Sequence, residues 1–176
     1  MFVSVFALNW QIGVKHFEFE LIHFFGTCTP HAKGKLGNNK LRNYKEYKSV
    51  FNCESYLEIN DPSLRRSIAQ IRLSAHKLNI ESGRYNGRNQ YVPPADRTCR
   101  NCALNDMEDE LHFVLKCTAY DHLRADLLKQ FEVGNPHFSS YNIHQKFIWI
   151  MSNENLDNLK SLGKYISAAL KVRKWE

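Results

Sequence analysis

Four potential metal ligands lie close together in the middle of this sequence and constrain the fold more than any other feature. They occur as Cys99-x2-Cys102-x9-His112-x4-Cys117, three thiols and one imidazole within nineteen residues. A Cys-x2-Cys pair in a tight turn brings two sulfurs onto one ion, and a second pair from a helix completes a tetrahedral site. The spacing therefore predicts a structural Cys3His site for Zn2+, in a zinc knuckle that spans residues 97–120.

The same four residues allow other interpretations, which we consider weaker. A redox pair at Cys99 and Cys102 would be expected within a β-α-β pattern, and no such pattern surrounds them. A degenerate motif that no longer binds metal is the second alternative. A catalytic zinc is disfavoured, because four protein ligands leave no coordination position for water.

A looser group of histidines and cysteines occurs near the N-terminus. His23, Cys28 and His31 are close in sequence, with His16 and Cys53 nearby. Isolated residues of these types in an aromatic-rich segment usually pack in the core or lie at the surface, so we expect no second metal site. A nucleophilic Cys28 with His31 as its base is also disfavoured, because no third group that would orient the base can be named.

The cysteine count and the N-terminal segment bear on the compartment. Five cysteines, an odd number, occur without a convincing secretory signal, which predicts reduced thiols in an intracellular protein of the nucleus or cytoplasm rather than a secreted one. Residues 1–14 are uncharged and apolar, but they fall short of the ~20 residues that span a bilayer. We expect them to form part of a core, with no contact to a membrane.

Apolar spacing predicts a mainly α fold, a small helical domain in which the zinc knuckle is embedded. Asp61 can cap a helix that begins at Pro62 and runs to Leu78. We expect three further helices, from about Glu108, from about Tyr120 and after a cap at Asn153, whereas residues 83–98 are a loop. Residues 17–21 alternate like a strand, although a short helix fits almost as well. The stripes expected to face the core are Leu64, Ile68, Ile71, Ala75 and Leu78; Leu111, Val114 and Leu115; Leu123, Leu127 and Phe131; and Leu159, Leu162, Ile166, Ala169 and Leu170.

Charge is distributed unevenly along the chain. The net charge is +6, but residues 61–100 carry 8 basic and 3 acidic side chains, and residues 101–128 carry 2 and 6. The segment that leads into the knuckle is therefore at +5, and the segment that contains most of the ligands is at −4. This asymmetry favours a polyanionic partner on the basic side, with the acidic segment turned away from it.

Arginines in the basic segment alternate with aromatic residues, a composition that can follow a phosphate backbone and stack on bases. An ordinary solvated helix face and loop would look similar. The candidate phosphate contacts are Arg65, Arg66, Arg72, Arg84, Arg88, Arg97 and Arg100, and the candidate stacking residues are Tyr85 and Tyr91.

Three runs of the sequence are similar to a known family. They are KLRNYKEYKSVF, SYLEINDPSLRRSIAQIRLSAHKLNIESGRY and RTCRNCALNDMEDELHFVLKCTAYDHLRADLL. Together they resemble the C-terminal, post-polymerase region of non-LTR (LINE-type) retrotransposon reverse transcriptases, which includes a Cys-Cys-His-Cys zinc-binding segment. The resemblance covers residues 40–131 and extends into a C-terminal helical tail, residues 132–176, whereas the apolar and aromatic residues 1–39 match poorly.

The resemblance implies an accessory region that helps to engage template RNA or target DNA, with its metal ligands at Cys99, Cys102, His112 and Cys117. It implies no enzyme, because the sequence has no aromatic-x-Asp-Asp polymerase motif and no recognisable set of endonuclease carboxylates. We expect a non-catalytic zinc-binding module that binds RNA or DNA with low specificity, with no small-molecule substrate. The alternative is a structural or protein-interaction module in which zinc only staples the helices, with a reverse transcriptase body as one possible partner.

Overall fold

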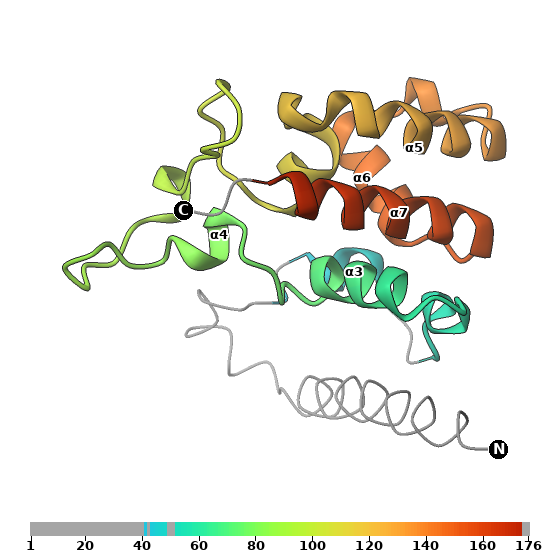
Figure 1. Cartoon of the computed structure of the whole chain (residues 1–176). Helices are drawn as coiled ribbons and strands as arrows, with labels where there is room; N and C mark the ends of the chain where they lie inside the picture. Colours follow the sequence, from blue (N-terminus) through green and yellow to red (C-terminus); the bar gives the residue numbers. More distant parts are fainter. Residues whose placement is uncertain (1–40, 42, 49–51, 174–176) are drawn as a thin grey trace, which may run out of the picture. The chain divides into compact units, whose positions relative to one another are not determined.

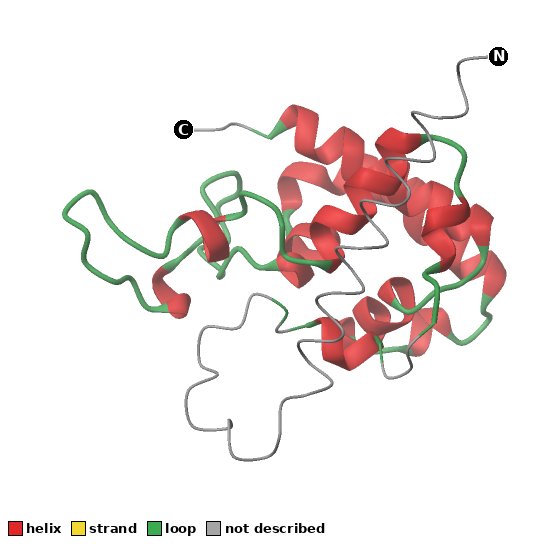
Figure 2. Cartoon of the chain, turned by 90° about the horizontal axis from the view of Figure 1, so that it is seen from below, coloured by secondary structure: helices red, strands yellow, loops and turns green. Residues whose placement is uncertain are grey.

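The computed structural model describes residues 41, 43–48 and 52–173. These residues form helices and loops with no extended strand, which confirms the prediction of a mainly α fold (Figure 2). The α-helices are α2 (Tyr44–Tyr47), α3 (Pro62–Arg72), α4 (Asn79–Ser82), α5 (Asp121–Gly134), α6 (Ile143–Met151) and α7 (Leu156–Val172). Short 3-10 turns η2 (Ser55–Glu58), η3 (Pro94–Asp96), η5 (Thr118–Tyr120) and η6 (Phe138–Ser140) and one π-helical turn, η4 (His112–Lys116), connect them.

Helix α3 begins where the sequence predicts but ends earlier. The Asp61 side chain accepts a hydrogen bond from the Ser63 amide, and Pro62 occupies the first helical position. The helix stops at Arg72 instead of Leu78, because Ser74 has a φ of 50° and its hydroxyl donates to the buried carboxylate of Glu110. Leu78 still reaches the core from the following turn, whereas Ala75 is exposed.

The three long helices α3, α5 and α7 form the main packed unit, which we call the helical body. Helix α7 lies between α3 and α5 and packs against both (Figure 1). Asn155, rather than the predicted Asn153, caps α7 by accepting from the amides of Asp157 and Asn158. The predicted core residues of α7 are confirmed at four of five positions, because Leu159, Leu162, Ile166 and Ala169 are fully buried and Leu170 is half-buried.

Gly163 allows the close approach of α7 to α3. A Cβ placed on Gly163 would lie 2.9 Å from the Cβ of Leu64 and 3.3 Å from its carbonyl oxygen. Only a residue without a side chain fits this crossing without displacing α3. Leu64 itself is half-buried, while Ile68 and Ile71 on the same face of α3 are fully buried.

Helix α5 buries Leu127 and Phe131 as predicted, with Leu123 half-buried. Helix α6 was not among the predicted helices. A capping box at its start, in which Asn142 and Gln145 exchange side-chain and main-chain hydrogen bonds, fixes its first turn. Its inner face buries Phe147, Ile150 and Met151. The segment expected to form a C-terminal tail therefore supplies two helices to the fold.

The chain divides into two units, and residues 41, 43–48 and 53–173 belong to the second of them. All the elements above belong to the second unit. The interpretations of residues 1–14 and 17–21, and of His16, His23, Cys28 and His31, lie outside the described residues. Within the described residues, no helix combines the length and the apolar character needed to cross a membrane.

Candidate functional site

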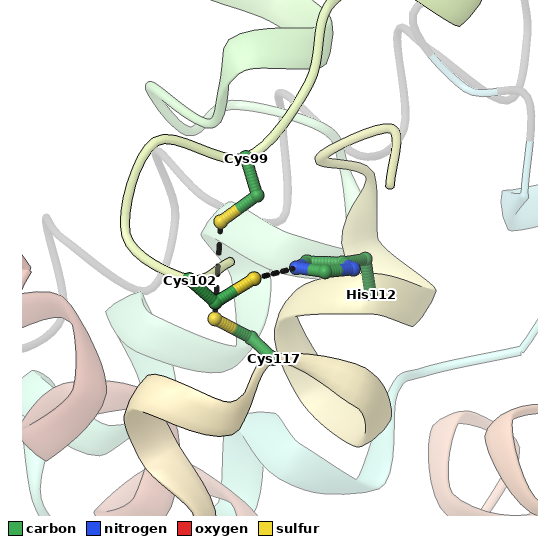
Figure 3. A group of neighbouring side chains, drawn as sticks. All are labelled: Cys99, Cys102, His112 and Cys117. Atoms are coloured by element: carbon green, nitrogen blue, oxygen red, sulfur yellow. Dashed lines mark hydrogen bonds between the residues drawn. The ribbon is translucent and has the colours of Figure 1, made fainter. Parts of the chain in front are cut away.

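The four predicted ligands come together in the folded chain (Figure 3). Their three sulfur atoms and one imidazole nitrogen all lie within 4.8 Å of one another. The Sγ atoms of Cys99 and Cys117 are 3.8 Å apart, and Sγ of Cys102 is 3.4 Å from Nε2 of His112. Cys99, His112 and Cys117 are buried and Cys102 is half-buried, so the group can hold a metal ion largely shielded from solvent.

A loop of residues 97–111, which we call the metal-site loop, presents the first two ligands. Its two arms pair through hydrogen bonds from the Cys99 amide to the Asp106 carbonyl (2.8 Å) and from the Glu108 amide to the Arg97 carbonyl (2.9 Å). The Asn101 amide points back at Sγ of Cys99 across 3.4 Å, as a tight Cys-x2-Cys turn requires. The loop reverses at Asn105, which has a φ of 51°.

A π-helical turn presents the other two ligands. Residues five apart lie ~140° from each other around an α-helix, so an ordinary helix would aim His112 and Cys117 in different directions. In η4 the Cys117 amide instead donates to the His112 carbonyl over 2.8 Å, which closes a wider turn. The helical segment begins at Glu110, two residues later than predicted, and the Asp109 side chain accepts from the His112 amide.

The two buried thiols are joined by a hydrogen bond, in which either sulfur can carry the proton. The hydrogen bond to Cys117, together with burial, raises the pKa of the Cys99 thiol to about 12. The same hydrogen bond lowers the pKa of Cys117. A cation bound here would take the place of that proton between the two sulfurs, since thiolates are the form that coordinates metal.

Glu108 connects the metal-site loop to the end of α7, a role that the sequence did not indicate. Its carboxylate is 1% exposed and accepts from both terminal nitrogens of Arg173, from the Asn79 amide (2.7 Å) and from Sγ of Cys99 (3.5 Å). Because Arg173 lies 65 residues further along the chain, no local spacing could reveal this pair. The arginine offsets the carboxylate charge beside the cysteine ligand.

Glu110 is also buried, so the acidic segment is not the solvent-facing surface that its composition suggests. Its carboxylate accepts from Ser74 (2.7 Å), from Asn43 (2.9 Å) and, at 2.9 Å, from Nε2 of His76. The carboxylates of Glu108 and Glu110, near the start of the helix predicted from Glu108, therefore serve as internal hydrogen-bond acceptors. Through Ser74 and His76, these contacts hold the segment between α3 and α4 against Glu110, which lies just before η4.

His112 has a second ring nitrogen that the described contacts leave without a hydrogen bond. Nδ1 of His112 is buried, and a carboxylate oxygen of Asp106 lies 4.0 Å from it. A histidine that binds metal through one nitrogen commonly donates from the other to a carboxylate, a carbonyl or water. Asp106 is the carboxylate positioned to accept a hydrogen bond from Nδ1 of His112, and it also forms an ion pair with Lys116 at 3.3 Å.

Three of the arginines expected at a nucleic-acid surface lie inside the fold instead. Arg65 donates to the carbonyl of Ile59 (2.5 Å). Arg72 donates to the carbonyl of Met151 (2.7 Å) and pairs with Glu54 (2.8 Å). Arg97 donates to the carbonyls of Val92 and Ile80, at 2.7 Å in each case. All three side chains are at most 7% exposed, so their guanidinium groups are already used to satisfy internal carbonyl and carboxylate oxygens.

The other candidates lie at or near the surface. Arg66, Arg88 and Arg100 are exposed, and Arg84 is half-buried and pairs with Glu81 at 2.6 Å. Tyr85 and Tyr91 are 60% and 50% exposed, the highest values among the Phe, Tyr and Trp residues of the described part of the chain. Apart from Arg66, these residues belong to a segment that extends away from the helical body (Figures 1 and 2).

No protein-family model, curated protein or solved structure matches the chain. In the described part of the chain, Cys99, Cys102, His112 and Cys117 are the only group of three or more potential ligands arranged to hold a metal ion. The assignment of the candidate site therefore depends on the positions of these four residues and on the segment that leads into them.

Proposed function

We propose that the chain is a non-catalytic, zinc-binding module that contacts RNA or DNA with low sequence specificity. The observation that carries the proposal is the placement of exposed arginines and tyrosines on a segment that runs directly into a Cys3His cluster. The metal fixes the loop from which that segment extends, and the arginines supply phosphate contacts.

Zinc is the ion that best fits the donor set. Zn–S bonds of about 2.3 Å and a Zn–N bond of about 2.0–2.1 Å place two sulfurs about 3.8 Å apart, and sulfur and nitrogen about 3.6 Å apart, in a tetrahedron. The Cys99–Cys117 and Cys102–His112 separations of 3.8 and 3.4 Å support this assignment. Four protein ligands close the coordination sphere, so the ion would stabilise the fold rather than activate water.

The nucleic-acid part of the proposal is tested by the salt dependence of binding. The logarithm of the association constant falls with the logarithm of salt by about 0.9 per phosphate contact on duplex DNA and about 0.7 on a single strand. We expect Arg88→Glu in the zinc-loaded chain to weaken binding and to flatten this slope, because Arg88 is exposed. Lys164→Glu reverses an exposed charge on α7 and is the matched control. A salt-independent titration, or equal effects of the two variants, contradicts the proposal.

We also infer that the chain derives from the post-polymerase region of a non-LTR retrotransposon reverse transcriptase. The resemblance of residues 40–131 motivates this inference, and the convergence of the four residues that it assigns as ligands supports it. An experimental structure of that region from an intact element should superimpose on α3, the metal-site loop, α5 and α7 in the same order. A different connectivity there would contradict the derivation.

A second candidate function is protein interaction, in a module where zinc only stabilises the packing of the helices. The observation that favours it is an apolar surface on α6, where Trp149 is 38% exposed and stacks edge-on against Tyr141, with Ile143 exposed nearby in sequence. A reverse transcriptase body is one partner that would fit this role. If this function is correct, Trp149→Ala should abolish formation of the protein complex in analytical ultracentrifugation and leave the oligonucleotide affinity unchanged. The nucleic-acid proposal requires no protein complex that depends on Trp149.

A further inference from the structure

The two exposed tyrosines belong to one small hairpin. Residues 84–92, which we call the tyrosine hairpin, close through a hydrogen bond from the Val92 amide to the Arg84 carbonyl (2.9 Å), and Tyr85 and Tyr91 are directly opposed across it. Their ring centroids are 6.2 Å apart at an interplanar angle of 73°. The pair is thus held together at the surface, where each of the two residues is at least half exposed to solvent.

The end of the hairpin is fixed by its own hydrogen bonds. The Asn86 side chain accepts from the amides of Arg88 and Gln90 at 3.0 Å each, and its amide nitrogen donates to the Gln90 side chain. Asn89 adopts a φ of 57°, which asparagine tolerates better than most residues. A ligand that docks on the two rings therefore orders little additional backbone, and this favours binding.

Arg97 connects the tyrosine hairpin to α4 and to the metal-site loop. Its guanidinium carbon lies 5.2 Å from the centroid of the Tyr91 ring, while its nitrogens donate to the Val92 carbonyl on the hairpin and to the Ile80 carbonyl on α4. The carbonyl of Arg97 also accepts a hydrogen bond from the main-chain amide of Glu108 in the metal-site loop. Arg97 thus ties the orientation of Tyr91 to the loop that carries the cysteine ligands, and it is a positioning residue rather than a contact.

The charge around the rings is positive. Residues 83–100 contain four arginines and one acidic residue, Asp96, which leaves a net +3. Arg88 is exposed in the hairpin itself, and Arg100 is exposed in the metal-site loop. A ligand that matches both features must present planar apolar faces and negative charge together. Nucleotide chains do so, and they expose the faces of their bases only where those bases are unpaired.

We propose that Tyr85 and Tyr91 form a stacking platform for unpaired bases, so that the chain binds single-stranded nucleic acid in preference to duplex. This inference rests on the proposed function and names its substrate class. Arg88 and Arg100 contact the phosphates beside the stacked bases, while the hairpin selects for strands whose bases are free. Stacking is tolerant of sequence because every base has a π-face, in keeping with low specificity.

The experiment is a fluorescence-anisotropy titration of the full zinc-loaded chain against three probes of equal length. The probes are a single-stranded oligonucleotide, a duplex and an abasic phosphodiester strand. Because stacking on a tyrosine is lost on truncation to alanine, Tyr85→Ala and Tyr91→Ala should each weaken binding to the single strand about 5- to 100-fold. Tyr85→Phe and Tyr91→Phe should retain the affinity, and neither alanine variant should change binding to the abasic strand or the duplex.

The possible results separate this inference from the proposed function. Unchanged single-strand affinity in both alanine variants, with Arg88→Glu still reducing it, overturns the stacking platform and leaves the nucleic-acid proposal standing. A duplex bound as tightly as the single strand by the wild-type chain also overturns it. Absence of binding to every probe at low salt overturns the proposed function and the inference together. Because both side chains are exposed, the circular dichroism and melting temperature of the variants should match those of the wild type.

Discussion

The helical body and the metal-site loop are held together by different means. In α3, α5 and α7 the core consists of aliphatic and aromatic side chains such as Ile68, Phe131 and Leu162, although three arginines of these helices, Arg65, Arg72 and Arg124, are buried as well. In the metal-site loop the buried side chains are Arg97, Cys99, Glu108 and Glu110, and no aliphatic or aromatic residue from 97 to 111 is buried. The loop therefore has no hydrophobic core of its own.

From this difference we infer which part of the chain would depend on a bound metal ion. Burial of apolar area stabilises the helical body whether or not an ion is present. The metal-site loop buries charged groups and thiols, which costs free energy unless each is paired or coordinated. The π turn belongs with the helical body, because Tyr165 donates to the Phe113 carbonyl (2.7 Å) and Arg124 donates to the carbonyls of Val114 and Cys117.

The largest effect on the structure and stability of the chain is expected from removing one metal ligand. Cys102→Ser changes the most accessible of the four ligands and so disturbs packing least. Since structural zinc contributes about 10–16 kcal/mol in zinc-finger peptides, we expect loss of the ion and loss of hydrogen-exchange protection across residues 97–111. The Cys99 and Glu108 amides, which donate to the carbonyls of Asp106 and Arg97 across the loop, should exchange freely. Protection should persist in α5 and α7. Uniform loss of protection throughout the chain would show that the two regions are not distinct.

The buried Glu108–Arg173 pair couples the two regions and should give the next largest effect. Glu108→Ala leaves Arg173 without the carboxylate it pairs with, and breaking a buried pair costs about 3–5 kcal/mol. Denaturant unfolding measures this change. Asp126→Ala, which removes an exposed carboxylate from α5, is the control and should change the free energy of unfolding by less than about 0.5 kcal/mol. Equal effects of the two variants would mean that Glu108 is not an internal anchor.

A smaller effect, confined to the helical body, is expected at the α3–α7 crossing. Gly163→Ala places a Cβ 2.9 Å from that of Leu64, and overpacking of this kind costs about 1–3 kcal/mol, reduced by up to about 1 kcal/mol through better helix propensity. Gly134→Ala, whose Cβ would meet only the Asn158 side chain at 3.6 Å, should not destabilise the chain. Thermal unfolding checks both, and metal content should be unchanged. A more stable Gly163→Ala variant would contradict the close crossing.

The smallest effect is expected at Cys53, the exposed free cysteine. Cys53→Ser should leave the metal content and the melting temperature unchanged, because an exposed thiol contributes little to packing. This variant is also the matched control for Cys102→Ser, since it makes the same substitution away from the cluster. A loss of metal on Cys53→Ser would assign the ion to other ligands.

Local patterns predicted the parts of the fold that depend on local interactions. The cap at Asp61, the apolar stripe of α7 and the four ligands follow from residue spacing within short stretches, and the structure confirms that they lie where the spacing places them. The end of α3 did not follow from spacing, because Ser74 leaves the helix to reach Glu110, 36 residues away. The apolar stripe from Leu64 to Leu78 continues through this break because Leu78 enters the core from the following turn.

The environment of the candidate site was predicted less well than its ligands. Composition alone does not distinguish a surface arginine from one that satisfies buried carbonyls, so Arg65, Arg72 and Arg97 were placed on the same surface as Arg88. The burial of Glu108 and Glu110 was not predicted, since their partners Arg173 and His76 come from other parts of the chain. Long-range pairs of buried charges leave no periodic signal in a sequence.

We propose that a zinc ion, rather than apolar packing, holds the metal-site loop. The most direct test is native mass spectrometry of the full chain combined with hydrogen exchange before and after removal of metal. The account predicts one zinc ion per chain, and loss of protection at the Cys99 and Glu108 amides on chelation while α7 remains protected. A metal-free chain in which those two amides stay as protected as in the loaded form would contradict it.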